Sequence, residues 1–371
     1  MFEDIETPCY ICEEELLEKN LKILSSVKQK SGAKILLALK GFAFYHLEPL
    51  VSKYLDGCCA SGLWEAKLSQ EKFGGFTHTY SPAFKEDEID EILDLSNHVV
   101  FNSFDQWQKY KAKALKKVSC GLRINPEISS APVELYNPCG LYSRFGVTKK
   151  EFREDLLDGI EGFHFHALCE QGADELERVL DSVEDKFGKY IYNLKWVNFG
   201  GGHHITKDGY DIEKLIKLIV NFKKKYGVEV YLEPGEAVGW KCGFLISTVL
   251  DIVHNGMDIA VLDTSSEAHM PDTLAMPYRA EVRGANEAGV RLHTYKLTGN
   301  SCLSGDIMGD YSFDKPLKIG DKIIFEDQIH YTIVKNTTFN GIKLPNLGIL
   351  KKDGKLKIVK KFKYEDYKNR N

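Results

Sequence analysis

An amine that could act as a nucleophile occurs at Lys40, directly after the apolar run at 35–39. Such a run predicts a buried strand, which would carry the lysine into largely apolar surroundings at its end. Burial favours the neutral amine, and a neutral amine forms a Schiff base with a carbonyl group. The alternative is a strand-end lysine that extends its ammonium group to water.

Three consecutive glycines, Gly200, Gly201 and Gly202, suit the binding of a phosphate group. Backbone N–H groups can approach an anion closely only where side chains are absent. A tight turn without a ligand is the alternative. The spacing is not GxGxxG, so a dinucleotide-binding signature is absent.

A carboxylate stands before a turn at Glu233-Pro234-Gly235. It could form an ion pair with a protonated ring nitrogen, as in pyridoxal phosphate, and so keep that ring an electron sink. The alternative is ordinary turn chemistry, in which the glutamate has no ligand.

Four histidines occur in two close pairs, His164 with His166 and His203 with His204. His164 and His166 are two residues apart and would share one face of a strand, which suits a metal pair. A zinc or iron hydrolase therefore stays an alternative, although no third ligand with a defined spacing accompanies them. His166 equally fits a histidine stacked on a cofactor ring, and we expect no metal.

Strand-like stretches that could position these residues recur eight times and alternate with helical patterns. They lie at 34–39, 57–60, 77–80, 97–101, 118–124, 160–166, 195–199 and 228–232. This alternation predicts a (β/α)8 TIM barrel, with a doubly wound open sheet as the alternative. The active site of a barrel lies at the carboxyl ends of its strands. The residues found at these ends are Lys40, Ser61, Arg123, Asn125, His166, Gly200–Gly202 and Glu233.

The pattern changes beyond residue 245, where short strands and turns predict an all-β domain, a β-sandwich or β-barrel. The strands are expected at 246–253, 258–262, 278–282, 293–298, 322–326 and 330–335. A strand at 7–12 has no partner before the first barrel helix, so we expect it to join this second domain. The predicted division is a barrel at 13–245 and a β domain made of 1–12 and 246–371.

Composition and charge limit the partners of the protein. Its 54 acidic and 49 basic residues give a net charge of -5, which provides no general attraction to nucleic acid or to an anionic membrane. No apolar run approaches the ~18 residues of a membrane helix. Nine cysteines without an export signal predict reduced thiols in the cytoplasm, despite the CxxC spacing of Cys9 and Cys12. The lysine-rich residues 351–371 are expected to form a solvated edge and tail.

Nine short motifs carry a resemblance along nearly the whole chain. They are ALKGF at 38–42, CAS at 59–61, SRFGV at 143–147, HFHALCE at 164–170, NFGGG at 198–202, EPGE at 233–236, AHMPD at 268–272, CLSGD at 302–306 and HYT at 330–332. In combination they resemble the fold type III, pyridoxal-phosphate-dependent decarboxylases with the alanine racemase-like fold. Within that group the chain is similar to the carboxynorspermidine decarboxylases.

This resemblance implies pyridoxal 5′-phosphate as the cofactor and assigns a set of residues to it. Lys40 would form the Schiff base, His166 would stack on the ring, Glu233 would pair with the ring nitrogen, Gly200, Gly201 and Gly202 would hold the phosphate, Tyr331 would reach the phosphate, and Ser61 would complete the cofactor site.

The same resemblance implies that Cys302 donates the proton that replaces the carboxyl group after CO2 leaves. In the family this cysteine and its neighbours come from the second subunit, which implies a head-to-tail homodimer with shared active sites. Asp306 would then pair across that interface, with Arg144 as its candidate partner, and we count Asp306 among the substrate-binding residues.

Departures from the family pattern indicate the substrate. Ornithine and diaminopimelate decarboxylases carry arginine at the position of Glu236, and ornithine decarboxylases carry aspartate at the position of Cys58. A carboxylate at 236 argues against diaminopimelate, whose distal carboxylate would face it. Carboxynorspermidine and carboxyspermidine instead bring ammonium groups, for which Glu236 and Asp272 are the candidate partners.

We therefore expect decarboxylation of carboxynorspermidine and carboxyspermidine to norspermidine and spermidine, in polyamine biosynthesis. The alternatives are a decarboxylase of another basic amino acid, such as diaminopimelate or ornithine, or a non-catalytic protein that binds pyridoxal phosphate.

Overall fold

The computed structural model describes residues 2–128, 136–276 and 278–371. The chain divides into two compact units, one of Glu18–Val238 and one of Met1–Leu17 with Gly239–Asn371. The predicted division after residues 12 and 245 lies a few residues away from these limits. The first difference arises because α1 (Glu14–Ser31) begins before the barrel unit.

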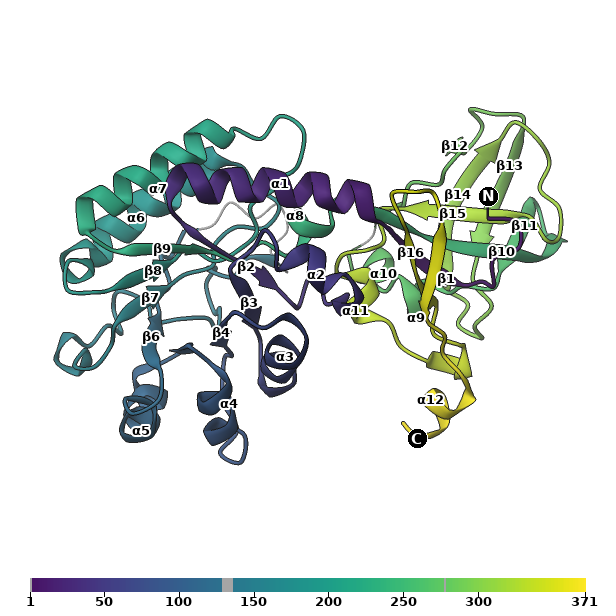
Figure 1. Cartoon of the computed structure of the whole chain (residues 1–371). Coiled ribbons are helices and arrows are strands. Elements are labelled where there is room, and N and C mark those ends of the chain that lie inside the picture. Colours follow the sequence, from purple (N-terminus) through teal and green to yellow (C-terminus); the bar gives the residue numbers. More distant parts are fainter. Residues whose placement is uncertain (1, 129–135, 277) are drawn as a thin grey trace. The chain divides into compact units, whose positions relative to one another are not determined.

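Eight parallel strands of the first unit close into a barrel in the order β2 to β9 (Figure 1). They are β2 (Lys34–Ala38), β3 (Gly57–Ala60), β4 (Phe76–Tyr80), β5 (His98–Phe101), β6 (Ser119–Arg123), β7 (Gly162–His164), β8 (Trp196–Asn198) and β9 (Glu229–Leu232). Each predicted strand ends within two residues of the observed one. The predicted TIM barrel is confirmed, and the doubly wound sheet is excluded.

Helices alternate with these strands around the barrel (Figure 1). Besides α1 they are α2 (Glu48–Val51), α3 (Leu63–Leu68), α4 (Ile89–Leu95), α5 (Phe104–Ala114), α6 (Ala173–Ile191), α7 (Ile212–Tyr226) and the short α8 (Glu236–Gly239). The signals that bound α7 are local: the Asp211 carboxylate accepts the Lys214 N–H at 2.8 Å, and Gly227 ends the helix at φ 73°. One face of the helix is buried, formed by Leu215, Ile216, Ile219, Phe222 and Tyr226, so its amphipathic pattern packs it on the strands.

The second unit is built on a branched mixed sheet of nine strands, in which β10 pairs with β1, β11 and β15. Its strands are β1 (Cys9–Glu13), β10 (Gly243–His254), β11 (Asp258–Leu262), β12 (Asn286–Glu287), β13 (His293–Thr298), β14 (Ile307–Phe313), β15 (Lys322–Glu326), β16 (Asn346–Leu350) and β17 (Leu356–Lys360). The N-terminal strand β1 pairs with β10 and β16, which confirms that it joins this domain. The predicted all-β domain is confirmed, and its strands form one connected mixed sheet.

Two predicted strands of this unit were wrong. Residues 330–335 are not a strand but contain α11 (Thr332–Lys335), because Tyr331 at φ 47° leaves the extended conformation. Residues 278–282 contribute only an isolated bridge at Val282. The solvated edge predicted at 351–371 is confirmed, since β17 is the last strand of the sheet and α12 (Tyr364–Lys368) has no buried residue.

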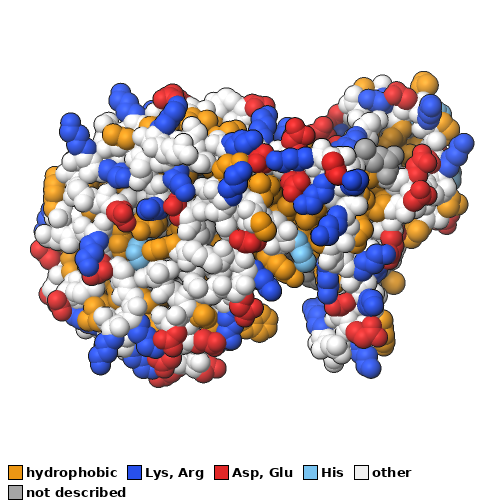
Figure 2. Space-filling view, viewed as in Figure 1, with side chains coloured by type: hydrophobic (Ala, Val, Ile, Leu, Met, Phe, Trp, Pro, Cys, Tyr) orange, Lys and Arg blue, Asp and Glu red, His pale blue; other side chains and the backbone are white. Residues whose placement is uncertain are grey.

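The surface and the helices agree with the expectations from composition. Among the described residues no helix is both long enough and apolar enough to cross a membrane. On the face of the barrel unit seen in Figure 2, Lys and Arg side chains are interspersed with Asp and Glu, without a field of one sign. All nine cysteines are free thiols, and the CxxC member Cys12 lies 3.9 Å from Cys242, measured between the two Sγ atoms.

Candidate active site

Lys40 lies in the turn that directly follows β2. The Gly41 N–H donates to the Ala38 carbonyl at 3.0 Å, so the chain turns as soon as the strand ends. The lysine side chain is exposed, which corrects the predicted apolar surroundings: the buried part of the strand stops before it. Burial, followed by the charge of Lys40, lowers the pKa of His166 well below its usual range, as expected if the amine faces the barrel mouth.

The Gly200–Gly202 loop follows β8 and is packed against the ends of neighbouring strands. A Cβ atom on Gly201 would lie 2.3 Å from the carbonyl oxygen of Glu233, and one on Gly202 would lie 2.0 Å from that of Leu168. No side chain fits in these places. Packing therefore requires glycine here. The N–H groups of Gly200 and Gly201 already donate to the Asn198 Oδ1 and the His166 Nδ1, so a phosphate at this loop would be met by the Gly202 N–H.

We expect Gly202→Ala to destabilise the barrel and to weaken phosphate binding. Gly209→Ala is a matched control, because Gly202 and Gly209 have φ values of 82° and 83° while a Cβ on Gly209 meets nothing within 4 Å. The steric conflict should cost about 1–3 kcal/mol beyond the control. Urea unfolding of both variants and titration with pyridoxal phosphate measure the difference, and equal stability and affinity would remove the loop from this role.

Glu233 follows β9 and is only 5% exposed. The Asn198 Nδ2 donates to its Oε1 at 2.6 Å, and the His164 Nε2 lies 3.5 Å from its Oε2. Burial acts to raise the pKa of Glu233, but His164 and His78 outweigh it and hold that pKa well below its usual range. The site therefore contains a buried carboxylate charge.

His166 lies just beyond β7 and is partly exposed. Its Nδ1 accepts the Gly201 N–H at 3.0 Å, so the proton of the neutral ring is on Nε2. Because its pKa is held well below the usual range, chiefly by burial, the imidazole is uncharged at neutral pH. A neutral, fixed ring can stack on a flat heteroaromatic group.

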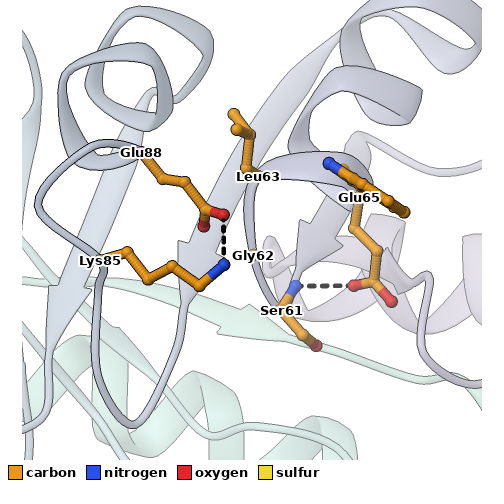
Figure 3. A pocket seen from close by; sticks show the side chains of 7 residues that line it. Ser61, Gly62, Leu63, Glu65, Lys85 and Glu88 are labelled. Atoms are coloured by element: carbon orange, nitrogen blue, oxygen red, sulfur yellow. Dashed lines mark hydrogen bonds and ion pairs between the residues drawn. The ribbon is translucent and has the colours of Figure 1, made fainter.

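Ser61 follows β3 and borders a pocket of about 340 Å³ (Figure 3). The Glu65 carboxylate accepts the Ser61 N–H at 2.6 Å, and the Lys85 ammonium pairs with Glu88 at 2.8 Å on the other side of the pocket. Trp64 also borders it and is 84% exposed. The pocket thus combines carboxylates with a large aromatic surface beside Ser61.

Glu236 begins α8 and faces the loop that follows β8. Its Oε2 lies 3.2 Å from the His204 Nε2, and one ligand atom each of Glu170, His204 and Glu236 lies within 4.8 Å of the other two. In the described part of the chain this is the group that could hold a metal ion. It includes neither His164 nor His166, so the histidine pair of the metal alternative is not assembled.

In the sheet unit, Cys302 is exposed and Tyr331 is partly exposed. The Asp272 carboxylate, at the start of α10 (Asp272–Ala275), accepts the Lys335 ammonium at 2.6 Å. The Lys335 and Asp272 side chains are 40% and 22% exposed, and an ion pair that solvent reaches in this way is weak.

Asp306 corrects the prediction of a substrate-binding group. It is 3% exposed, and its Oδ1 accepts from the Ser266 N–H at 2.6 Å and from the Ser266 hydroxyl at 2.8 Å. Its Oδ2 accepts from the Ser301 N–H at 3.3 Å. A buried carboxylate with both oxygens occupied stabilises the loops around it and is not available to a ligand.

Comparison with known proteins decides the family. The model of a family described as "Pyridoxal-dependent decarboxylase, C-terminal sheet domain" matches residues 9–328. The chain belongs to this family. In this pyridoxal-dependent decarboxylase the matched span includes the barrel site and the sheet domain up to β15.

The named relatives of this chain are also decarboxylases. The chain is 59% identical, over the full length of both proteins, to a carboxynorspermidine/carboxyspermidine decarboxylase from Campylobacter jejuni. It is 45% identical to a carboxyaminopropylagmatine decarboxylase from Synechocystis, covering 99% of this chain and 95% of the relative. A crystal structure of the Campylobacter jejuni carboxynorspermidine decarboxylase with norspermidine superposes with a TM-score of 0.93 at 57% identity, covering 99% of this chain and all of the other.

The barrel of this pyridoxal-dependent decarboxylase fits its cofactor. A glycine loop that excludes side chains suits a phosphate, the buried carboxylate of Glu233 suits a protonated ring nitrogen, and the neutral His166 suits the ring face. Lys40 supplies an amine at the same end of the barrel.

Sequence reasoning missed the buried polar groups behind these residues. His78 and His98 lie in β4 and β5 and are 0% and 6% exposed, and Asn198 ends β8 with 0% exposed. The only signal for the histidines was a polar residue inside strands that otherwise alternate as barrel strands do. Glu233, which Asn198 and His78 contact, is 155 residues away from His78 along the chain, a separation that no periodicity reveals.

Proposed function

We propose that this decarboxylase removes the carboxyl group of carboxynorspermidine and carboxyspermidine to give norspermidine and spermidine. The observation that carries the proposal is the 59% identity over both full lengths to an enzyme of that name. The likeness at 15–19% identity to diaminopimelate and lysine/ornithine decarboxylases supports the fold alone.

The proposed roles of the residues follow from the site. When bound, pyridoxal phosphate supplies the conjugated electron sink that decarboxylation needs. Lys40 attaches it covalently, the Gly200–Gly202 loop and Tyr331 bind its phosphate, and Ser61 completes its site. Glu233 keeps the ring nitrogen protonated, and His166 shields one ring face from water. Cys302 delivers the proton that replaces the lost carboxyl group.

We propose that carboxylates select the polyamine substrate. An ammonium group that leaves water needs a charged partner, and Glu236 and Asp272 are the candidates on the two units. Glu236 occupies the position at which an arginine would bind the distal carboxylate of diaminopimelate. The negative charge of Glu236 would instead repel that carboxylate. Besides the α-amine, ornithine and lysine carry one amine, whereas carboxynorspermidine carries two for these acids to bind.

We also propose a homodimer with shared active sites, acting in the cytoplasm. Large apolar side chains support a protein partner for the barrel unit, because Leu141 and Tyr142 are 81% and 95% exposed. Cys302, which is exposed in the sheet unit, would enter the site of the second subunit. Sedimentation of the purified protein tests the dimer.

A CO2-release assay tests the function. The substrates are carboxynorspermidine, carboxyspermidine, carboxyaminopropylagmatine, ornithine, lysine, arginine and diaminopimelate. We expect the highest kcat/KM with the first two, which differ by one methylene and should differ little. A higher kcat/KM with the agmatine derivative would reassign the substrate. Bound cofactor without CO2 from any substrate would favour a non-catalytic protein.

We expect Asp272→Asn to lower kcat/KM for carboxynorspermidine about tenfold while cofactor absorbance is unchanged. The Asp272 side chain is 22% exposed. The binding free energy lost in the variant should therefore lie between that of an exposed ion pair and that of a buried ion pair, which is ~2–5 kcal/mol. Glu236→Gln is the comparison, and steady-state kinetics at fixed pH and salt measure both. An unchanged kcat/KM in Asp272→Asn with a large loss in Glu236→Gln would place amine binding at the end of β9.

A further inference from the structure

The carboxylate of Glu233 is surrounded by polar groups from three other strands, and none of them has a role in the proposed chemistry. Asn198 on β8 donates to its Oε1, His78 on β4 has its Nε2 at 3.4 Å from the same oxygen, and His164 on β7 has its Nε2 at 3.5 Å from Oε2. All four residues are at most 5% exposed. A charge buried this deeply is stable only if such partners are held in place.

The orientation of Asn198 is fixed by the glycine loop. Its Oδ1 accepts the Gly200 N–H at 2.8 Å, so its Nδ2 must face Glu233. The same Nδ2 donates its second hydrogen to the His78 Nε2 at 3.1 Å, because an amide nitrogen only donates. One amide therefore links the loop that would hold a phosphate to the carboxylate that would meet a ring nitrogen.

The other ring nitrogen of His78 contacts a second histidine. Its Nδ1 lies 3.4 Å from the Nδ1 of His98 on β5. The His98 ring stacks on Trp196, with centroids 4.2 Å apart and an interplanar angle of 13°. Burial lowers the pKa of His78 to about 4 and that of His98 to about 2, so each ring carries one proton at neutral pH.

These contacts select one arrangement of the two protons. The His78 Nε2 accepts from the Asn198 amide, so the proton of the neutral His78 ring is on Nδ1 and is donated to the Nδ1 of His98. The proton of His98 is then on its Nε2. His78 therefore binds one hydrogen of the Asn198 amide while Glu233 binds the other.

We propose that His78, backed by His98, is a positioning residue that orients the Asn198 amide and through it aims the Glu233 carboxylate at the place where the ring nitrogen of the cofactor meets it. The proposal rests on the proposed function only for the presence of that ring nitrogen. His78 does not touch the reacting atoms and acts through Asn198 and Glu233.

Other titratable groups also face this carboxylate. Besides the two histidines they are Cys59 on β3, Tyr80 on β4 and His166 beyond β7. The positive charges of Lys40 and Arg123 act on His164. Only His78 and His164 place a ring nitrogen within 4 Å of Glu233 in the described residues, so removal of His78 should be felt there first.

The decisive variants are His78→Phe, which keeps a ring without an acceptor, and His78→Gln, which restores an acceptor. An Asn198 amide that is no longer held stabilises the charge of Glu233 less, so the pKa of Glu233 rises and activity that needs the carboxylate is lost at a higher pH on acidification. In the cofactor-loaded His78→Phe enzyme we expect the acid limb of kcat to move up by about one pH unit. We expect kcat to fall about tenfold with little change in KM, and the pH titration of the cofactor absorbance to shift in parallel.

His78→Gln should recover most of the kcat and the pH profile. His254→Gln is the control, because His254 also lies beside a carboxylate, Asp258, at 2.9 Å, but is 72% exposed. It should leave both pH profiles unchanged. A wild-type absorbance titration and pH profile in a folded His78→Phe enzyme would overturn the proposal.

Nitrogen NMR of histidine-labelled wild-type protein tests the assignment without turnover and without a variant that must fold. We expect His78 and His98 to stay neutral between pH 5.5 and 8, with the His78 proton on Nδ1. A His78 proton on Nε2 would overturn the proposed contact with the Asn198 amide. These outcomes are separate from the proposed function, because failure of that function appears as absent CO2 release by the wild-type enzyme.

Discussion

Replacement of Lys40 by alanine is expected to abolish covalent attachment of pyridoxal phosphate and to lower CO2 release roughly a thousandfold. Lys40 ends a barrel strand at the face where the glycine loop, His166 and Glu233 also lie. The covalent link fixes the cofactor in register with these groups, and its loss leaves only reversible binding.

Borohydride reduction followed by peptide mass analysis shows whether the lysine carries the cofactor. Lys34→Ala is the control, because Lys34 begins the same strand and its side chain is 47% exposed beside Asp56. It should keep the reduced adduct, the visible absorbance and normal turnover. An intact adduct with near-normal CO2 release in Lys40→Ala would falsify the assignment.

Replacement of Cys302 by alanine is expected to leave cofactor binding intact and to make turnover inactivating. Without a thiol to protonate the carbon that has lost CO2, the proton would be added to the cofactor carbon instead. Water would then release pyridoxamine phosphate together with the aldehyde that corresponds to the amine product. Cys302 is exposed in the isolated chain, as a group that serves a second subunit would be. Chromatography of the released coenzyme, together with CO2 and amine yields, measures the partition.

Two controls separate the chemistry of Cys302 from dimer loss. Sedimentation should show unchanged dimers, and Cys302→Ser should give an intermediate partition.

If sites are shared, an equal mixture of Lys40→Ala and Cys302→Ala subunits should recover about a quarter of wild-type activity, because half of the dimers then hold one intact site of two. The role of Cys302 as the proton donor would be contradicted by no recovery in demonstrated mixed dimers, or by clean single-product turnover of Cys302→Ala alone.

The barrel could be predicted from the sequence because its signals are local. Each strand is a short apolar run bounded by turn residues, and the eight runs recur between amphipathic helices such as α7. Once the strands are placed, the barrel topology brings their carboxyl ends together. Lys40, His166, Gly200–Gly202 and Glu233 then fall at one end without further information. The resemblance supplied their detailed roles.

The sheet domain was predicted less well, because its strands pair over long distances. β1 pairs with β10 and β16, which lie more than 230 and 330 residues away along the chain. A strand propensity at 330–335 gave way to α11 once Tyr331 adopted φ 47°. Tertiary context of this kind overrides local preference.

The sequence by itself determined which residues stand at the ends of the barrel strands, because alternation and turn chemistry are encoded within short windows. Only the tertiary structure decided their surroundings. It buries Asp306 under Ser266, leaves Lys40 exposed, and sets His78 of β4 against Glu233 beyond β9. The physical reason is that burial and charge depend on which strands become neighbours across a closed barrel, and contacts across 155 residues leave no periodic trace in the chain.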